Sequence, residues 1–410
     1  MLPFRGVRYS YRDPAVLGRV IAPPYDAVDT ETQSLCYRSH PHNVIRLELA
    51  ETLLGDDEKD NRYTRAAEHY RRWLTEGILI RDETPLVYLY RQTFPGGFPE
   101  RWGLFASVGL SRYNGGEIFP HEETQSSALE DRLRLLRATG TNVSPIFALY
   151  PDEEDRVLRV LRDAACTTPE VSARKEDGSA HAVWPVGGAA AEGISHLMRS
   201  MPLFIADGHH RYETALLYHQ ERDDEASGRV MMGLVNLFDP ALAVLPTHRL
   251  ATNVPVEVMY QLKEGRAQGF FGERLASLDD TLKALKEAQG PAFGLYVQGR
   301  FFLMSLTDAG ERDMEALVPL RSRAWRSLDV SALHVLLLDK TMSGATLGFS
   351  HDAPRAVSQV DARRRQAAFL VRACTPTAVR NIALKGERMP QKSTYFYPKL
   401  PTGLVLHPLD

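Results

Sequence analysis

The most informative stretch of the sequence is a run of five residues that could bind phosphate, bind a metal ion or move protons. These residues are Asp207, Gly208, His209, His210 and Arg211. Residues 204–206 are apolar or small, typical of the end of a buried strand, and residues 212–217 predict the start of a helix. A strand that turns through glycine into a helix directs backbone N–H groups at one point, which favours an anion. Phosphate or nucleotide binding is therefore the leading interpretation. A metal site, or a polar loop that only caps the helix, is the alternative.

Two earlier stretches carry residue types that could complete such a site. Residues 43–49 alternate with period two, which predicts a strand with Arg46 and Glu48 on one face. If that face lines a cleft, Glu48 is a candidate general base and Arg46 a phosphate ligand; on an exposed sheet they would only pair in solvent. His121 and Glu122 could serve as acid–base groups or hold Mg²⁺, or their polar loop could be a solvated surface.

Two later stretches, 245–249 and 389–399, are predicted as loops and add residue types that bind phosphate. Their candidate ligands are His248, Arg249, Lys392, Ser393, Thr394 and Lys399. Loops often carry binding residues, although each of these side chains could instead be an ordinary polar group of the surface. The chain contains no GxxxxGK[ST], GxGxxG, GxSxG or HExxH pattern, which excludes the common P-loop and Rossmann nucleotide sites.

Composition and charge limit the class of protein. The chain has 410 residues, enough for two domains or one elaborated domain, with 44% hydrophobic and 25% charged residues. A formal net charge of -3 gives no general attraction to nucleic acid or to an anionic membrane. The three cysteines form no CxxC pair, so neither a disulfide framework nor a structural zinc site is predicted. Without an apolar span or a signal-peptide pattern, a cytoplasmic protein is predicted.

Helices and strands are predicted in alternation, which indicates an α/β or α+β fold. Strands are predicted at residues 86–94, 103–110, 144–150, 204–206, 230–238 and 367–373. Helices are predicted at residues 62–79, 129–138, 152–165, 194–201 and 375–387. The pattern changes near residue 250, which predicts a division into regions 1–250 and 251–410.

Several blocks of the sequence resemble one family in their order along the chain. The blocks are APPYDAV, NVIRLEL, HEET, TNVSPIF, ADGHHRYETAL, LVN, LPTHR and MPQKSTYFYPKL. On these blocks the chain is identified as a member of DUF1015, a family of bacterial and archaeal proteins of unknown function. The resemblance covers nearly the whole chain and implies no assigned activity.

The stretch 205–217 also resembles the core motif of the ParB/sulfiredoxin superfamily, which includes CTP-dependent partition switches, sulfiredoxins and free serine kinases. The resemblance implies that Gly208 and Arg211 cradle nucleotide phosphates at a helix N-terminus. Its Asp-Gly-His-His form is most similar to the free serine kinases, whose catalytic glutamate comes from an earlier strand, and Glu48 is the implied counterpart. The implied fold is a ParB/sulfiredoxin-like core with large insertions in residues 1–250, followed by a C-terminal α/β extension of unknown role.

Residues and resemblance together predict a nucleotide-dependent phosphotransferase that acts on a small hydroxyl substrate, with free serine as the expected acceptor. Its cofactors would be Mg²⁺ and ATP or ADP. Glu48 would take the hydroxyl proton, Asp207 with Glu122 would hold Mg²⁺, and His209 and His210 would position the transferred phosphoryl group. Further phosphate contacts would come from Gly208, Arg211, Arg46, His248, Arg249 and Lys392, and Lys392 with Lys399 would close over the site.

Three other functions fit the same residues. A phosphatase or nucleotide hydrolase would use the same pocket with water as the acceptor. A nucleotide-binding regulatory protein would bind without turnover. A metal hydrolase would use His121, Glu122, His209 and His210, although these residues follow no recognised ligand spacing.

Overall fold

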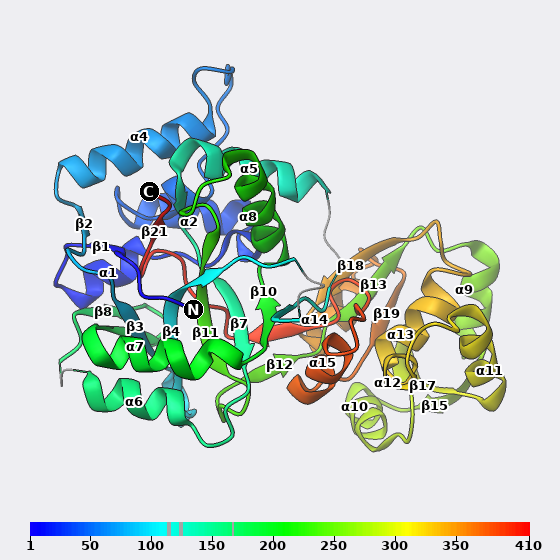
Figure 1. The fold of residues 1–410 in the computed structure, drawn as a ribbon. Coiled ribbons are helices and arrows are strands. Elements are labelled where there is room, and N and C mark those ends of the chain that lie inside the picture. The colour runs from blue at the N-terminus through cyan, green and yellow to red at the C-terminus, as the bar shows by residue number, and fades with distance from the viewer. Residues whose placement is uncertain (113–115, 123–125, 166–167) are drawn as a thin grey trace. The chain divides into compact units, whose positions relative to one another are not determined.

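The computed structural model describes residues 1–112, 116–122, 126–165 and 168–410, and the chain divides into two compact units. Unit 1 comprises Met1–Pro120, Thr124–Ala243 and Pro398–Asp410, and unit 2 comprises His121–Glu123 and Val244–Tyr397. The last segment of the chain therefore belongs to unit 1, which differs from the predicted division into regions 1–250 and 251–410. Each unit combines helices with a sheet, so the chain has the mixed α/β class that its sequence predicts (Figure 1).

Unit 1 is built on a mixed eight-stranded sheet in the order β5-β10-β7-β11-β4-β3-β9-β8. The bounds are β3 Val87–Thr93, β4 Arg101–Gly109, β5 Ile118–Phe119, β7 Ile146–Tyr150, β8 Val171–Arg174, β9 Ala180–Val186, β10 Leu203–Asp207 and β11 Arg229–Asn236. Strands β10 and β7 are antiparallel, and Asp207 lies opposite Phe147. This register places the end of β10 beside the start of β7.

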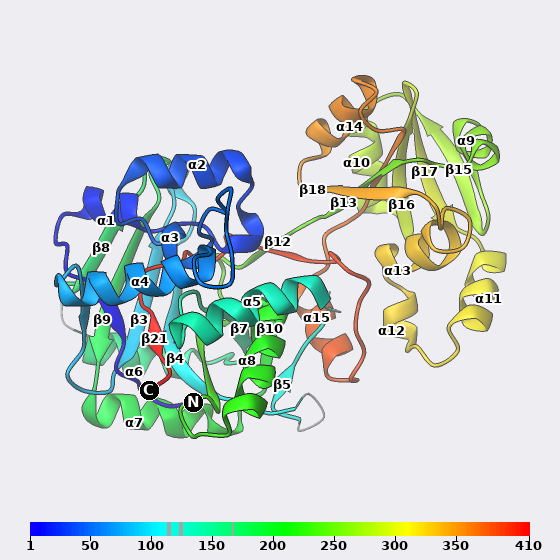
Figure 2. The same ribbon diagram turned by 90° about the horizontal axis from the view of Figure 1, so that it is seen from above.

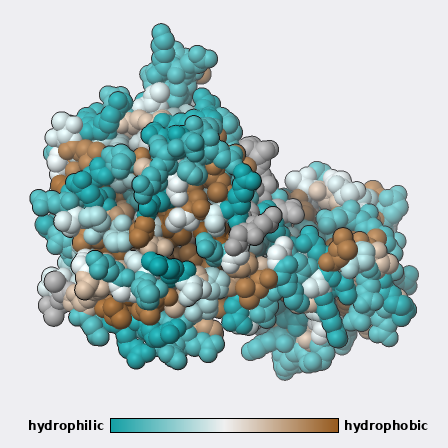
Figure 3. Space-filling model, in the orientation of Figure 1, coloured by the Kyte–Doolittle hydropathy of each residue, from teal (hydrophilic) through white to brown (hydrophobic). Residues whose placement is uncertain are grey.

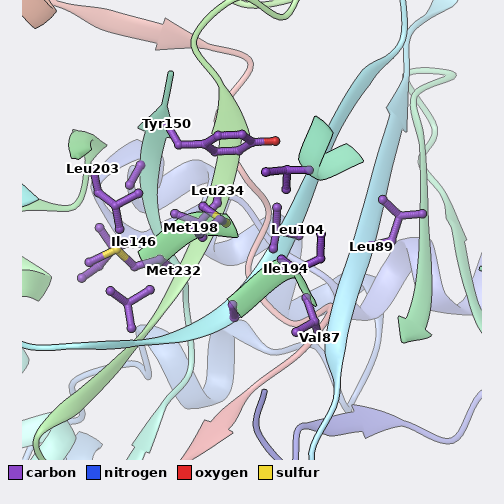
Figure 4. Close-up of a cluster of buried hydrophobic side chains, with 14 of the residues drawn as sticks. Val87, Leu89, Leu104, Ile146, Tyr150, Ile194, Met198, Leu203, Met232 and Leu234 are labelled. Carbon is purple, nitrogen blue, oxygen red and sulfur yellow. The ribbon is translucent and has the colours of Figure 1, made fainter. Parts of the chain in front are cut away.

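One face of this sheet packs against α6 (Arg156–Ala164) and α7 (Gly188–Leu197). Every second side chain of a strand points to this face, and the central strands β7 and β11 are buried along nearly their whole length. The buried residues labelled in Figure 4 are Val87, Leu89, Leu104, Ile146, Tyr150, Ile194, Met198, Leu203, Met232 and Leu234. This core fixes the strands whose ends carry the polar residues described below.

The C-terminal segment, Pro398–Asp410, lies against the opposite face of the sheet. Leu400 occupies the space beside Gly233 of β11, since a Cβ on that glycine would lie 2.2 Å from Leu400 Cδ1. The guanidinium of Arg101 on β4 donates to the carbonyl oxygen of Pro398 and, over 2.6 Å, to Oε1 of Gln92. These contacts hold the start of the segment against the sheet.

Helices and short strands complete unit 1. The helices are α1 Pro14–Val20, α2 Thr30–Ser39, α3 Ile45–Glu48, α4 Arg62–Thr75, α5 Ser126–Thr139 and α8 His209–Arg222, with short turns η1 Tyr25–Ala27, η2 Pro95–Gly97 and η4 Met198–Ser200. Helix α5 packs against both α4 and α8 (Figure 2). Two antiparallel pairs are formed by β1 Val7–Tyr9 with β2 Leu79–Arg81 and by β6 Thr141–Asn142 with β21 His407–Pro408.

The prediction of a strand over residues 43–49 is wrong, because the core of this stretch forms α3. Asn43 stabilises the start of the helix: its Oδ1 accepts from the N–H of Ile45 at 2.9 Å, and its Nδ2 donates to the carbonyl of Arg19 at 2.7 Å. The alternation is misleading because Glu48 is itself 2% exposed, so the polar residues do not mark a face turned to solvent.

Unit 2 contains a seven-stranded sheet in the order β14-β15-β17-β16-β19-β13-β18. Its strands are β13 His248–Thr252, β14 Arg266–Ala267, β15 Phe270–Leu275, β16 Ala292–Val297, β17 Arg300–Leu306, β18 Thr346–Ser350 and β19 Ala367–Leu370; β12 Ala243–Leu245 pairs separately with β20 Tyr395–Tyr397. Its helices are α9 Val256–Lys263, α10 Leu278–Glu287, α11 Asp308–Leu317, α12 Arg323–Arg326, α13 Asp329–Leu333, the π-helix η5 His334–Leu338, α14 Ala353–Asp361 and α15 Pro376–Ala383. The prediction that His248 and Arg249 lie on a loop is wrong, because both belong to β13.

The surface of unit 1 seen in Figure 3 is a mixture of hydrophilic residues and scattered apolar patches. Within the described residues, no helix combines the length and the apolar character needed to cross a membrane.

Candidate active site

The turn between β10 and α8 has the geometry that the sequence predicts, with a longer helix. Gly208 adopts φ 94° and ψ 29° and is the N-cap of α8, which begins at His209 rather than at Tyr212. The histidines and Arg211 therefore form the first helical turn and not a preceding loop. Because the first N–H groups of an α-helix have no partner within the helix and carry the positive end of its dipole, this turn favours an anion.

Asp207, the last residue of β10, is ionised and paired through both of its carboxylate oxygens. Its Oδ2 accepts from Nη2 of Arg211 at 2.7 Å, and its Oδ1 lies 2.8 Å from Nζ of Lys399. Burial would raise the pKa of Asp207, but the charges of Lys399 and Arg211 outweigh burial and hold that pKa below its ordinary value. Asp207 therefore stays a carboxylate throughout the physiological pH range.

Lys399 joins two carboxylates in the interior of unit 1. Its ammonium contacts Asp207 and also Asp26 in η1, and its side chain is 11% exposed. Burial lowers the pKa of Lys399, while Asp207 and Asp26 together raise it above its ordinary value, so the group remains charged. The sequence singles out Lys399 as a phosphate-binding type, but no pattern there connects Lys399 with Asp26.

The guanidinium of Arg211 is held in place by two of its three nitrogens, and the third has no partner among the described residues. Its Nη1 donates to the carbonyl oxygen of Pro145, just before β7, and its Nη2 donates to Asp207. Its Nε is buried and, among the described residues, has no hydrogen-bond partner. A Cβ on Gly208 would lie 2.9 Å from this Nε, so the close approach of Arg211 requires glycine at that position.

Glu48 lies in a second cluster of charged groups. Its Oε1 accepts from the hydroxyl of Ser144 at 2.9 Å and from Nη1 of Arg132 at 3.3 Å. The same Nη1 donates to the backbone carbonyl of Glu48 at 2.9 Å, and Nη2 of Arg132 lies 2.5 Å from Oδ2 of Asp131. The buried carboxylate is therefore fixed in orientation by Arg132 and Ser144.

A cavity of about 50 Å³ brings the two clusters together. Its polar lining comes from Glu48, Arg132, Thr141, Asn142, Ser144, Arg211 and Thr214. This volume admits water or a small polar group and is too small for a nucleotide.

The ring of Tyr25 lies near both guanidiniums of the site. Its centroid is 4.3 Å from Cζ of Arg132 and 5.9 Å from Cζ of Arg211. Burial raises the pKa of Tyr25 to about 12, so the phenol is neutral at physiological pH. Tyr25 therefore contacts the guanidinium of Arg132 and lies near that of Arg211 without adding a charge.

The two predicted histidines lie in the first turn of α8. His209 is 7% exposed, and its charge, when present, lowers the pKa of Asp207. His210 is half-buried. Both histidines interact with other groups in the folded chain. Their roles in positioning a phosphoryl group stay predictions.

Arg46 lies outside the cavity that Glu48 lines. Its Nη2 donates to the carbonyl of Tyr37 at 3.1 Å, and its guanidinium carbon is 4.1 Å from the centre of the Tyr37 ring. The prediction that Arg46 and Glu48 share a face is wrong, because residues two apart point in different directions on a helix.

The predicted residues His121 and Glu122 belong to unit 2. Nε2 of His121 lies 2.6 Å from Oγ1 of Thr394, and Oε1 of Glu122 accepts from the backbone N–H of Thr394 at 3.2 Å. Within the described residues, no group of three or more His, Cys, Asp or Glu side chains is arranged to hold a metal ion. Binding of Mg²⁺ by Glu122 and Asp207 stays a prediction.

His248, Arg249 and Lys392 also belong to unit 2. His248 is 2% exposed; its Nδ1 accepts from the N–H of Val371 at 3.2 Å, and burial lowers its pKa to about 4. Arg249 is fully buried and donates to the carbonyls of Thr247 and Gln391, and burial lowers its pKa to about 10. Lys392 is exposed. Phosphate binding by these three residues stays a prediction.

Sequence comparison assigns the chain to a family. The model of the family described as protein of unknown function (DUF1015) matches residues 1–331, and the chain belongs to this family. No curated protein matches the chain.

Three solved structures illustrate the structural likeness. A conserved hypothetical protein from Pyrococcus furiosus is 14% identical with a TM-score of 0.39, covering 74% of this chain and 95% of its own. A mutant free serine kinase in complex with ADP is 15% identical with a TM-score of 0.40, covering 76% and 98% respectively. SbnI with a C-terminal truncation, from Staphylococcus aureus, is 11% identical with a TM-score of 0.39, covering 74% and 87%.

Replacing Gly208 with alanine tests how closely Arg211 is packed at the turn. We expect Gly208→Ala to lower the free energy of unfolding by about 2–4 kcal/mol, because it combines a positive φ with displacement of the guanidinium. Gly140→Ala is the matched control: Gly140 has φ 57° with no atom within 4 Å of its Cβ position, so only the backbone cost of about 1 kcal/mol applies. Equal losses in denaturant unfolding would contradict the close packing of Arg211.

Proposed function

We propose that this member of the DUF1015 family is a nucleotide-dependent phosphotransferase acting on a small hydroxyl compound, with free serine as the first acceptor to test. The observation that carries the proposal is that Glu48 and Arg211 line one cavity at the N-terminus of α8. A carboxylate that can take a proton then lies beside a cation and a helix terminus that can hold a phosphoryl group.

The phosphate groups would bind at the first turn of α8. Nε of Arg211 is a buried donor without a partner among the described residues, and the guanidinium geometry suits phosphate oxygens. Lys399 supplies a second positive charge through its contact with Asp207. Phosphoryl transfer depends mainly on positioning and charge neutralisation, which these groups would supply together with His209 and His210.

The hydroxyl acceptor would bind in the cavity beside Glu48. Both described side-chain contacts of the Glu48 carboxylate are made by Oε1, which leaves Oε2 to accept the hydroxyl proton. The acceptor oxygen would lose its proton to Glu48 and form a bond to phosphorus. The bond from phosphorus to the bridging oxygen of the nucleotide would break, and the nucleotide would leave with that electron pair.

Mg²⁺ would accompany the nucleotide, ATP or ADP, and neutralise its phosphate charge. Asp207 already uses one oxygen for Arg211 and the other for Lys399, so direct ligation of the ion by Asp207 would break one of these pairs. Because Mg²⁺ in proteins usually keeps several of its waters, we favour contact through a bound water at Asp207.

Product analysis by ³¹P NMR separates this proposal from the alternatives. With Mg²⁺, ATP or ADP, and L-serine, we expect a new phosphomonoester signal. Free phosphate alone would indicate a hydrolase, which the small cavity beside Glu48 also allows because it can hold a water molecule. Nucleotide binding without any product would indicate a regulatory protein. Either of these two results contradicts transfer to serine.

Two substitutions distinguish the proposed role of Glu48 as the proton acceptor from that of Arg211 as a phosphate ligand. We expect Glu48→Gln to lower turnover about 100-fold or more while nucleotide affinity is kept, because only the proton acceptor is lost. We expect Arg211→Ala to weaken nucleotide binding about ten-fold or more in calorimetric titration. The control Arg159→Ala changes an exposed arginine of α6 and should alter neither quantity. Full turnover in Glu48→Gln would contradict its role as the base.

A further inference from the structure

A second polar pocket in unit 1 is lined by residues from near both ends of the chain. Two of its lining residues, Phe4 and His407, are in contact, with ring centres 4.4 Å apart. The pocket has a volume of about 340 Å³, and its charged or polar lining comes from Arg5, Arg81, Ser107, Glu225, Arg229, His407 and Asp410. It shares no lining residue with the cavity of Glu48 and Arg211.

The lining of this pocket contains three arginines and two carboxylates, those of Glu225 and Asp410. Arg81 holds the carboxylate of Asp410 with both terminal nitrogens, at 3.0 and 2.5 Å. Arg229 donates to Glu225 at 2.8 Å, but the Glu225 side chain is 88% exposed, so solvent screens that pair. Nε of Arg5 donates to a backbone carbonyl at 3.0 Å, and among the described residues no carboxylate pairs with Arg5. The arginines thus retain positive charge for a further anion.

Three buried polar atoms of the lining residues also lack a partner among the described residues. Ser107 is 1% exposed and His407 is 5% exposed. Among the described residues, Oγ of Ser107, Nδ1 of His407 and Nε of Arg81 have no hydrogen-bond partner. Leaving such a buried group unpaired costs about 1–3 kcal/mol, so a ligand that accepts hydrogen bonds here would recover that loss.

We propose that this pocket is a second binding site, for a small oxyanion that carries a phosphate or carboxylate group. The guanidiniums of Arg5 and Arg229 bind the anion, and the hydroxyl of Ser107 and the imidazole of His407 donate to it. Burial, with the charges of Arg229 and Arg81, lowers the pKa of His407 to about 4, so the ring is neutral at pH 7 and carries one N–H. The site is independent of the proposed phosphotransferase function.

The ring nitrogens of His407 report directly on this site. We expect inorganic phosphate, titrated into protein labelled with ¹⁵N-histidine at pH 7 and constant ionic strength, to shift the His407 signals saturably. The His407→Gln variant assigns those signals. Malonate in a parallel titration distinguishes a carboxylate ligand from a phosphate ligand, and a saturable shift with either probe supports the site.

Substitutions locate the binding. Arg229→Gln should lower the anion affinity measured from the His407 shifts about ten-fold. Arg5→Gln should also lower that affinity, and it is the variant to use if Arg229→Gln does not fold. Arg159→Gln, which changes an exposed arginine of α6, should leave the response unchanged. The proposal is overturned if neither anion shifts His407 saturably, or if the response is as strong in Arg229→Gln and Arg5→Gln as in the unsubstituted protein.

Discussion

The partly buried pairing of Asp207 with Lys399 and Arg211 is the interaction on which the site depends. Charged groups inside a protein must be paired, because removing one partner leaves an uncompensated charge at a cost of several kcal/mol. Asp207 ends a strand, Arg211 lies in the following helix and Lys399 belongs to the C-terminal segment. One carboxylate therefore ties three parts of unit 1 together at the N-terminus of α8.

The same constraint explains why the C-terminal segment returns to unit 1. Leu400 packs beside Gly233, and the carbonyl of Pro398 accepts from Arg101, so Lys399 is held between two anchored neighbours. The cavity lined by Arg211 is also lined by Glu48. Arg132 and Ser144 hold the carboxylate of Glu48 in a fixed orientation. The proposed chemistry depends on these positions.

Local patterns in the sequence predict the strand, the glycine turn and the helix that carry Asp207 and Arg211. They also single out Glu48. The strand predicted there is a helix in the structure, because the buried Glu48 occupies a polar position of an apparent period-two pattern. The contact of Lys399 with Asp26 could not be predicted, since it joins residues 373 positions apart. The burial of Arg249 in β13 could not be predicted either, because arginine is rarely buried inside a sheet.

The most direct test of this account is the pKa of Asp207, measured by ¹³C NMR of its carboxyl group, with Asp207→Asn to assign the signal. The account predicts a pKa below the ordinary value of 3.8 and an increase in Lys399→Met. Because the folded pKa is lowered, ionisation of Asp207 stabilises the fold above pH 3.8, and that contribution is lost as the pH falls toward the folded value. A pKa at or above 3.8, unchanged in Lys399→Met, would contradict the pairing on which the site rests.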